Sequence, residues 1–249
     1  MKTFVWQVKS ELIQLLRIPA FAISAIVFPV ILFIFIAFLN FNNLSSENGG
    51  YGHFLMAGVI VLGVVGVLFF EYGIGVSNER EGGLFRHLRT TPIRPIIYLA
   101  AKIMTGVILS AISVLLVVLV AIVGFGIRFP FNPLLFILTI FIGALPFTAM
   151  GFALGYSVNP RAASATANLV YLPMSFLSGL FYDLGGAPEY LQWIANLSPM
   201  TYYANSVRGA MSGSLSVILN NLGILAIYTV IFAAIAIYGY QNDEYLEYS

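Results

Sequence analysis

The chain has 249 residues, of which 60% are hydrophobic and only 8% are charged, whereas soluble domains carry about 25% charged residues. This composition leaves no room for a soluble catalytic domain, and the lack of cysteine excludes disulfides, thiolate nucleophiles and cysteine metal sites. The net charge of +1 gives no indication of a nucleic-acid partner.

The N-terminal segment predicts an amphipathic helix. Phe4, Val8, Leu12 and Leu15 recur at helical spacing, most of the charged residues lie elsewhere, and Pro19 interrupts the pattern. We expect this helix to lie in the cytoplasmic interface of a membrane and to turn into the apolar run that follows. A plain anchor without a mechanical role is an equally open interpretation.

Six long apolar runs follow one another along the chain. They occupy residues 20–39, 54–76, 101–125, 134–156, 163–182 and 216–240. A helix needs about 20 residues to cross a bilayer, and hydrocarbon forces such a run to close its own backbone hydrogen bonds. The runs lack the alternating polarity of barrel strands. The sequence therefore predicts an all-α integral membrane protein with six transmembrane helices in a single domain, residues 1–249.

The distribution of basic residues predicts the orientation. With both termini in the cytoplasm, the inner segments contain nine of the eleven basic residues, namely Lys2, Lys9, Arg17, Arg80, Arg86, Arg89, Arg94, Lys102 and Arg161. Only Arg128 and Arg208 fall outside, which is a strong positive-inside bias. The first run is much longer than the 7–15 apolar residues of a cleaved signal peptide. We therefore expect a multi-pass protein of a bacterial cytoplasmic membrane.

The loop between the second and third runs carries more charge than any other segment. Gly82 and Gly83 permit a turn, and Pro92 and Pro95 end any helix soon afterwards, so we expect a short amphipathic helix over residues 84–90. Such a helix can transmit force from a soluble partner. Composition alone favours the alternative of an ordinary solvated loop.

Polar groups inside the spans are the candidates for a transport path. Glu71 lies within the second run, where its carboxylate contacts either substrate or only neighbouring protein. The fifth run is rich in small and hydroxyl residues and contains Asn168 and Pro173, which favours a protein or water contact over lipid. Gly151 and Gly155 form a GxxxG pair that we expect to pack within the subunit.

The outer segment after the fifth run contains two short amphipathic stretches, residues 189–197 and 199–211. Ser198 and Pro199 have the residue types of a helix cap and a first turn. These stretches are expected to form a short re-entrant region that dips back into the outer leaflet and closes an exit, to seat aromatic side chains at the outer interface, or both. His53 and His87 lie on opposite sides and predict no metal site.

Two stretches resemble the membrane subunits of ABC-2 type exporters. The inner loop EREGGLFRHLRTTP matches the family pattern at Glu79, Arg80, Glu81, Gly83, Leu88, Thr91 and Pro92. The region after the fifth run matches at Pro173, Ser178, Gly179, Pro188, Pro199, Tyr202, Tyr203 and Arg208. Six spans, an interfacial N-terminal helix and the chain length also agree with the family, so the resemblance covers essentially the whole chain.

The resemblance implies a role for each of these regions. It makes the inner loop a coupling helix that contacts an ATPase through Glu79, Arg80, Glu81, Gly83, Leu84, Phe85, Arg86, Leu88, Arg89, Thr91 and Pro92. It makes spans two and five the translocation path, with the candidates Glu71, Asn168, Tyr171, Pro173, Ser175 and Ser178. The exit gate would contain Tyr182, Trp193, Pro199, Tyr202, Tyr203 and Arg208. Because Arg86 stands where the family often has Glu, we expect a more acidic partner surface.

The partner ATPase is expected on a separate chain. The sequence has no G-x-x-x-x-G-K-[ST] phosphate loop and no Gly-Lys pair. We therefore expect no catalytic residues, cofactor or metal on this chain, with ATP and Mg held by two copies of an ATP-binding-cassette subunit. A second permease subunit, identical or a close paralogue, would complete an exporter of amphiphilic or lipophilic substrates such as drugs, antibiotics, peptides or glycolipids.

Two other classes of protein remain as alternatives. An ion-coupled secondary transporter would act without an ATPase and would need several buried ionisable groups, whereas in the sequence Glu71 stands by itself. An intramembrane enzyme would need paired aspartates or an HExxH cluster at membrane depth, and the sequence contains neither.

Overall fold

The computed structural model describes residues 2–17, 23–41, 50–82, 95–127 and 132–246, and within these ranges the chain forms helices and turns without a strand. The prediction of an all-α protein is confirmed for this part of the chain. The helices, in chain order, are α1 Lys2–Leu16, η1 Ile23–Val27, α3 Phe28–Leu39, α5 Gly50–Phe70, η2 Glu71–Gly75, α6 Val76–Glu81, α8 Pro95–Phe125, α9 Pro133–Gly143, α10 Leu145–Ser157, α11 Pro160–Leu177, η3 Leu184–Gly186, α12 Glu189–Asn196, α13 Pro199–Ser212 and α14 Leu215–Leu246.

Four helices among the described residues are long and apolar enough to cross a membrane: Gly50–Glu81, Ile97–Phe125, Pro133–Ser157 and Leu215–Gln241. They coincide with the second, third, fourth and sixth predicted spans. The first predicted span appears as the short helix α3 with the π-helical turn η1 before it. The fifth appears as α11, whose first half is polar, and the chain turns at Gly179 before residue 182 is reached. The six-span topology stays a prediction.

The fourth predicted span is not one continuous helix. It is divided at Ala144 into α9 and α10, and Pro146 occupies the first turn of the second piece. Proline has no backbone N–H to donate to the preceding turn and its ring crowds that turn. The break therefore follows from the sequence.

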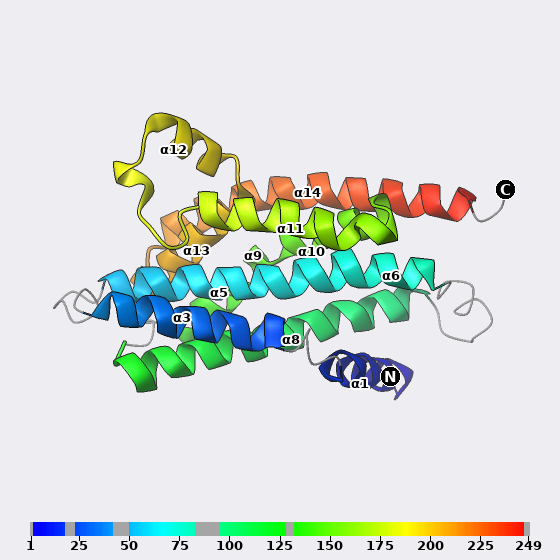
Figure 1. Cartoon of the computed structure of the whole chain (residues 1–249), viewed down its shortest axis with the longest axis horizontal. Coiled ribbons are helices and arrows are strands. Elements are labelled where there is room, and N and C mark those ends of the chain that lie inside the picture. The colour runs from blue at the N-terminus through cyan, green and yellow to red at the C-terminus, as the bar shows by residue number, and fades with distance from the viewer. Residues whose placement is uncertain (1, 18–22, 42–49, 83–94, 128–131, 247–249) are drawn as a thin grey trace.

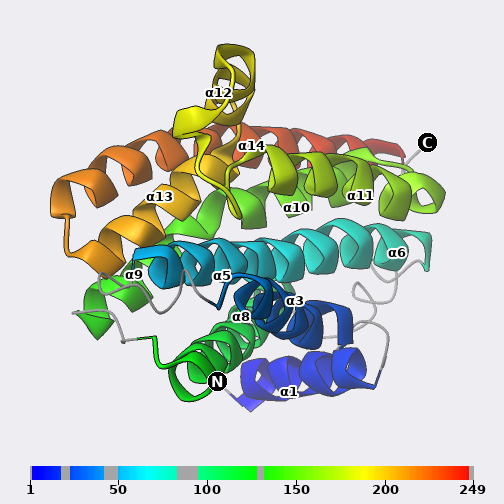
Figure 2. The ribbon, with the colours of Figure 1, turned by 60° about the vertical axis from the view of Figure 1, so that its left-hand side comes forward.

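The long helices run side by side along the long axis of the molecule (Figure 1). One end, called the inner end here, carries α1, the end of α6, the start of α8 and the last turns of α14 (Figure 1). The opposite, outer end carries α12, α13 and the first turns of α5 (Figures 1 and 2). The positive-inside bias predicts that the inner end is cytoplasmic.

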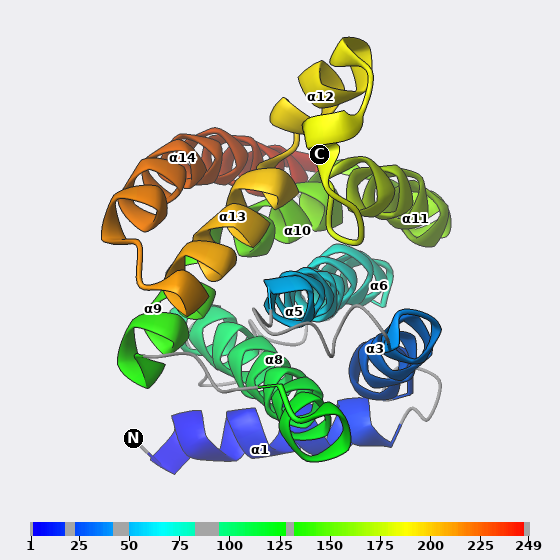
Figure 3. The ribbon, with the colours of Figure 1, turned by 90° about the vertical axis from the view of Figure 1, so that its left-hand side faces the viewer.

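Helix α5 lies in the middle of the bundle, with α3, α8, α10, α11 and α13 around it (Figure 3). It is apolar on every side, and its residues 55–65 are all buried. A helix that is hydrophobic all round is stable only when other elements cover every face. Its composition therefore places it at the centre.

Small residues let the neighbouring backbones approach α5. A Cβ atom at Gly151 would lie 3.0 Å from the Leu68 carbonyl oxygen, and one at Gly155 would lie 2.6 Å from the Tyr72 carbonyl oxygen. The GxxxG pair thus packs within the chain, as predicted. On the outer half, Gly58 is in direct contact with the backbone of Leu180, again without space for a side chain.

Candidate functional site

The inner end contains a buried group of charges next to residues 83–94. Lys102, from the second turn of α8, is only 1% exposed. Its Nζ lies 2.6 Å from Oε1 of Glu79 in α6 and 3.5 Å from Oε1 of Glu71 in η2. Tyr98, one turn earlier in α8, donates its hydroxyl to the other Glu79 oxygen. These contacts fix α6 to α8 on either side of the predicted coupling loop.

The N-terminal helix adds a third carboxylate to this group. Glu11 of α1 is 7% exposed and accepts a hydrogen bond of 3.3 Å from Gln7 Nε2. Burial raises the pKa of Glu11; the charge of Lys102 opposes the rise and that of Glu79 adds to it. We call Glu11, Glu71, Glu79, Tyr98 and Lys102 the inner charge cluster.

The backbone around Glu71 is shaped to admit this cluster. Glu71 opens the π-helical turn η2, an irregularity that often marks functional positions. Gly75 lies beside this pair, since a Cβ atom there would be 3.7 Å from both Glu71 Oε1 and Lys102 Nζ, an ordinary van der Waals contact. Tyr72 stacks on Phe152 of α10, with ring centroids 4.6 Å apart, and donates a hydrogen bond of 3.1 Å to an α8 carbonyl.

Arg80 connects α6 to the next inner turn. Its Nη1 donates to the carbonyl oxygens of Gly155 at 2.7 Å and Val158 at 3.4 Å. These carbonyls lie at the C-terminal end of α10, where the last C=O groups of a helix have no N–H partner within the helix. Glu81, in contrast, is 54% exposed and 3.9 Å from the exposed Arg161.

The three described residues of the predicted ATPase interface thus lie differently. Glu79 and Arg80 point into the chain, and Glu81 points to the surface. The other predicted interface residues lie outside the described residues, namely Gly83, Leu84, Phe85, Arg86, Leu88, Arg89, Thr91 and Pro92. The contact with an ATPase stays a prediction for all eleven.

A cavity of about 670 Å³ lies between α3, α5 and α11. Its walls are largely apolar, with Phe28 and Ile31 from α3, Leu62 and Phe70 from α5, and Leu172 from α11. The helices that enclose it correspond to the first, second and fifth predicted spans. A space of this size and polarity fits a lipophilic molecule or part of one.

Two of the six predicted path residues line this cavity. Asn168 is exposed and bonds to the Ser164 carbonyl at 2.9 Å, while the Tyr171 hydroxyl donates at 2.9 Å to the carbonyl of Leu62. The other four lie elsewhere. Glu71 belongs to the inner charge cluster, and Pro173 is exposed; Ser175 bonds to its own helix, and Ser178 bonds to Ser198 at 2.7 Å.

At the outer end a half-buried cation joins three segments. Arg208 of α13 donates through Nη2 to the Gly179 carbonyl at 2.7 Å and lies 3.7 Å above the ring of Phe54 in α5. Gly179 has a φ of 65°, which only glycine adopts without strain. Burial lowers the pKa of Arg208 to about 10, and the charge of Asp183 opposes this. We call Phe54, Gly179 and Arg208 the outer clamp.

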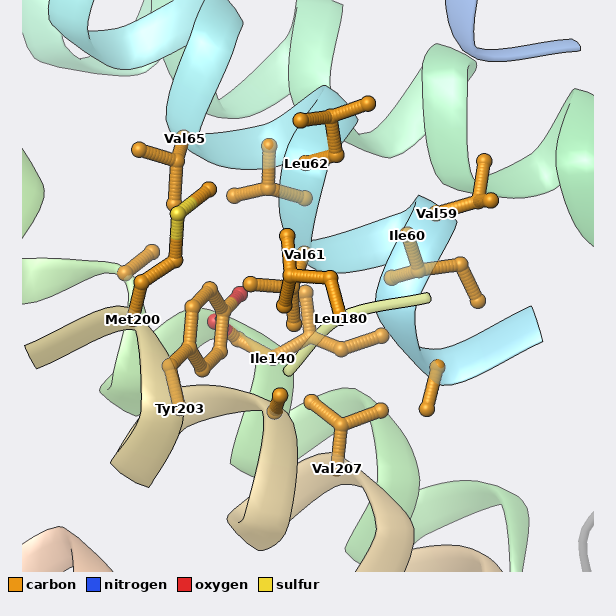
Figure 4. Close-up of a cluster of buried hydrophobic side chains, with 14 of the residues drawn as sticks. Val59, Ile60, Val61, Leu62, Val65, Ile140, Leu180, Met200, Tyr203 and Val207 are labelled. Carbon is orange, nitrogen blue, oxygen red and sulfur yellow. The ribbon is translucent and has the colours of Figure 1, made fainter. Parts of the chain in front are cut away.

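The remaining exit-gate candidates divide between core and surface. Tyr203 is buried beside Met200 and Ile140, where its hydroxyl donates to the Ile140 carbonyl at 2.8 Å (Figure 4). Pro199 is buried after the cap Ser198, as predicted, and Tyr202 donates to the Asn196 carbonyl at 2.7 Å. Tyr182 and Trp193 are exposed. Helix α13 is therefore a core element, not a surface stretch.

The sequence analysis did not identify Phe54, Tyr98, Glu11 or Lys102 as site residues. Lys102 offered a signal, because a lysine inside an apolar run needs an acidic partner. The sequence around Phe54 and Tyr98 gives no such indication, because their contacts depend on the rotation of each helix about its axis. Within the described part of the chain, no group of three or more His, Cys, Asp or Glu residues could hold a metal ion.

Comparison with known proteins adds an independent observation. A sequence model described as ABC-2 type transporter matches residues 3–212. YvfS of Bacillus subtilis, named as a transport permease, is 25% identical over 94% of this chain and 96% of its own length. The inner membrane transport permease YadH of Escherichia coli is 22% identical over 82% of both chains. The permease ycf38 of the alga Porphyra purpurea is 29% identical over 79% of this chain and 69% of its own.

Proposed function

This chain belongs to the ABC-2 type transporter family, and we propose that it exports an amphiphilic or lipophilic substrate as the membrane permease subunit of an ABC transporter. The ATP would be hydrolysed by a separate ATP-binding-cassette subunit present in two copies. A second permease, identical or a close paralogue, would complete the assembly in the cytoplasmic membrane of a bacterium. The drug, antibiotic, peptide and glycolipid classes all fit this description of the substrate.

The inner charge cluster is the observation that carries this proposal. Glu79 precedes residues 83–94 and Lys102 follows them, and their 2.6 Å contact holds the two flanking helices together. A force applied to the loop would therefore reach α6 and α8 as one unit, and the π-helical turn η2 continues that unit into α5. Movement of a rigid element against a packed bundle is a common form of switching.

The cavity supports the choice of substrate class. Ligand pockets for small molecules are mostly apolar and measure roughly 300–1,000 Å³, and this one measures about 670 Å³. Its walls come from α3, α5 and α11, so a displacement of α5 would change its shape. We propose that closure of the ATPase dimer moves α5 relative to α11 and drives the substrate outward.

Ion-coupled transport is the second candidate, and one observation favours it. In the sequence, Glu71 is an isolated ionisable residue within an apolar run. In the structure, Lys102 lies 3.5 Å from Glu71, and the charges of Glu79 and Glu11 also act on this lysine. A group of buried ionisable side chains is a feature of proton relays. Family membership favours the ATP-driven proposal. Substrate uptake driven by an imposed ion gradient, with the purified chain alone in vesicles, would support the second candidate instead.

The experiment for the main proposal alters the coupling loop in a complete transporter. The chain and its ATPase are reconstituted together, with the changes Arg86→Glu, Arg89→Glu and Leu88→Pro combined. We expect at least a ten-fold loss of transport and of substrate-stimulated ATP hydrolysis, because the contact surface is reversed in charge and its helix is broken. Ser212→Glu, at an exposed position of the outer end, is the control and should retain both activities. Unchanged transport and hydrolysis in the triple variant would overturn the proposal.

A further inference from the structure

Helix α1 lies across the inner end of the bundle, crosswise to the long helices (Figures 1 and 3). One of its faces packs inward, where Val8 is buried and Leu12 and Leu15 contact the cluster of Val67 and Leu109. The single acidic residue of α1, Glu11, is also on this inward side. The opposite face of α1, called its outer face here, points away from the bundle and is exposed.

The outer face of α1 combines cations with exposed apolar side chains. Trp6 is 66% exposed, and Lys9 Nζ lies 5.3 Å from its ring centroid. A hollow of about 380 Å³ on this face is lined by Trp6, Lys9, Ser10, Ile13, Gln14 and Arg17. The ammonium, hydroxyl, amide and guanidinium groups around it all donate hydrogen bonds, and no carboxylate of the described residues lines it.

This combination specifies the kind of ligand. Two cations and two neutral donors without an acid favour an anion with several acceptor oxygens, such as a phosphate. Tryptophan and basic side chains are enriched together where the lipid headgroups lie, and clustered lysine and arginine residues at the cytoplasmic surface attract anionic lipids. A free phosphate would make no use of the exposed ring of Trp6 or of Ile13.

We propose that the outer face of α1 binds the phosphate of an anionic phospholipid from the inner leaflet. Lys9 and Arg17 contact the phosphate, Ser10 and Gln14 supply further donors, and Trp6 lies at the level of the glycerol group. The bound lipid holds α1 against α8 and so keeps Glu11 beside the inner charge cluster. This inference needs only that α1 lies at the inner interface, and it does not depend on an ATPase.

The two tryptophans of the chain allow a direct test, because Trp6 and Trp193 lie at opposite ends of the bundle. In the Trp193→Phe variant, Trp6 is the only tryptophan. This variant is placed in phosphatidylcholine vesicles that contain a small fraction of either dibrominated phosphatidylglycerol or dibrominated phosphatidylcholine, and quenching of the fluorescence is measured. We expect the apparent affinity of the Trp6 site for phosphatidylglycerol to be about ten-fold higher, since each basic residue near an anionic leaflet contributes several-fold.

Two changes should abolish that preference. Lys9→Gln combined with Arg17→Gln should bring the two lipids to equal quenching, and Lys9→Arg should retain the preference. Adding inorganic phosphate to the buffer should not compete, which separates a lipid headgroup from a free anion. The Trp6→Phe variant, which reports from Trp193, should show no preference that depends on Lys9 or Arg17.

Three results would overturn the inference. Equal quenching of Trp6 by both lipids would mean contact with lipid but no anionic site. No quenching by either lipid would mean that protein, such as a second copy of the chain, covers the face. Competition by inorganic phosphate would assign the site to a soluble anion. Each of these leaves the proposed function untouched, because the vesicles contain no ATPase.

Discussion

The two ends of the bundle hold their helices together by different means. At the inner end the single ammonium group of Lys102 forms ion pairs with two carboxylates, those of Glu71 and Glu79. At the outer end Arg208 donates to the carbonyls of a tight turn and lies on the ring of Phe54. The inner acceptors are charged and outnumber their cation, whereas the outer acceptors are neutral.

This difference indicates which end of the bundle is able to rearrange. In the outer clamp, Arg208 donates to backbone carbonyls whose position is set by the turn at Gly179. We therefore expect this contact to keep a single geometry. In the inner charge cluster, Lys102 lies 2.6 Å from Glu79 and 3.5 Å from Glu71, and a small rotation of α6 would exchange the two partners. Elements with two discrete packed arrangements are the ones that switch. We infer that the inner end moves during transport and the outer clamp holds α5 to α13.

The largest expected effect comes from removing the shared cation. Lys102→Met removes the ammonium group that pairs with the buried Glu71 and the half-buried Glu79, and breaking a buried ion pair in this way costs about 3–5 kcal/mol. The thermal unfolding midpoint in detergent should fall strongly. Arg161→Met, at a side chain that is 89% exposed, is the control and should change little. Combining Lys102→Met with Glu79→Gln should recover part of the loss, because it removes one unpaired charge. A Lys102→Met protein as stable as the wild type would contradict the described inner end.

The outer clamp should respond less. Arg208→Gln removes a charge-assisted hydrogen bond to a carbonyl and a cation–π contact, so we expect a loss of about 2–3 kcal/mol. A double-mutant cycle with Phe54→Leu should give a coupling of about 1 kcal/mol between ring and guanidinium. Zero coupling in this cycle would show that the ring does not contact the cation.

The contribution of Glu11 to stability should depend on pH. Its pKa is raised in the folded protein, so the folded state holds the proton more tightly and this side chain reduces stability as the pH rises above its ordinary value of 4.5. Glu11→Gln should therefore raise the unfolding midpoint at pH 7 by an amount smaller than the Arg208 effect, and the gain should vanish at pH 4. A gain that does not vary between pH 4 and pH 7 would rule out this explanation.

The smallest effect is expected for the exposed pair at the inner surface. Arg161 and Glu81 are 3.9 Å apart and both exposed, and such pairs contribute about 0–1 kcal/mol. Arg161→Gln should leave the unfolding midpoint within about a degree of the wild type. A drop comparable to that of Arg208→Gln would show that charge at the inner end stabilises the fold generally, and not only within the inner charge cluster.

Local patterns in the sequence predicted much of this architecture. Four of the six apolar runs, the N-terminal helix and the cap at Ser198 depend on neighbours within a few residues, and the structure confirms them. Pro146 also indicates a break near Ala144, although no break was predicted there. These features required no knowledge of how helices meet.

The contacts between helices could not be predicted in the same way. Glu79 and Lys102 are separated by residues 83–94, and their pairing depends on the rotation of two helices about their axes. The same holds for Phe54 and Arg208, which come from α5 and α13. The burial of α13 was missed because its polar residues, such as Thr201 and Ser206, bond to nearby backbone carbonyls and so enter the core.

We propose that residues 83–94 receive the ATPase, and the inner charge cluster joins the two helices that flank them in the sequence. Because the chain has no cysteine, single cysteines at Leu88, at Arg161 and at the outer residue Ser212 can be compared by cross-linking within the reconstituted transporter. We expect Leu88→Cys to cross-link to the ATPase subunit at a rate that changes on addition of ATP, and Ser212→Cys not to react with it. An intact complex in which Leu88→Cys gives no cross-link, while Arg161→Cys does, would contradict the account.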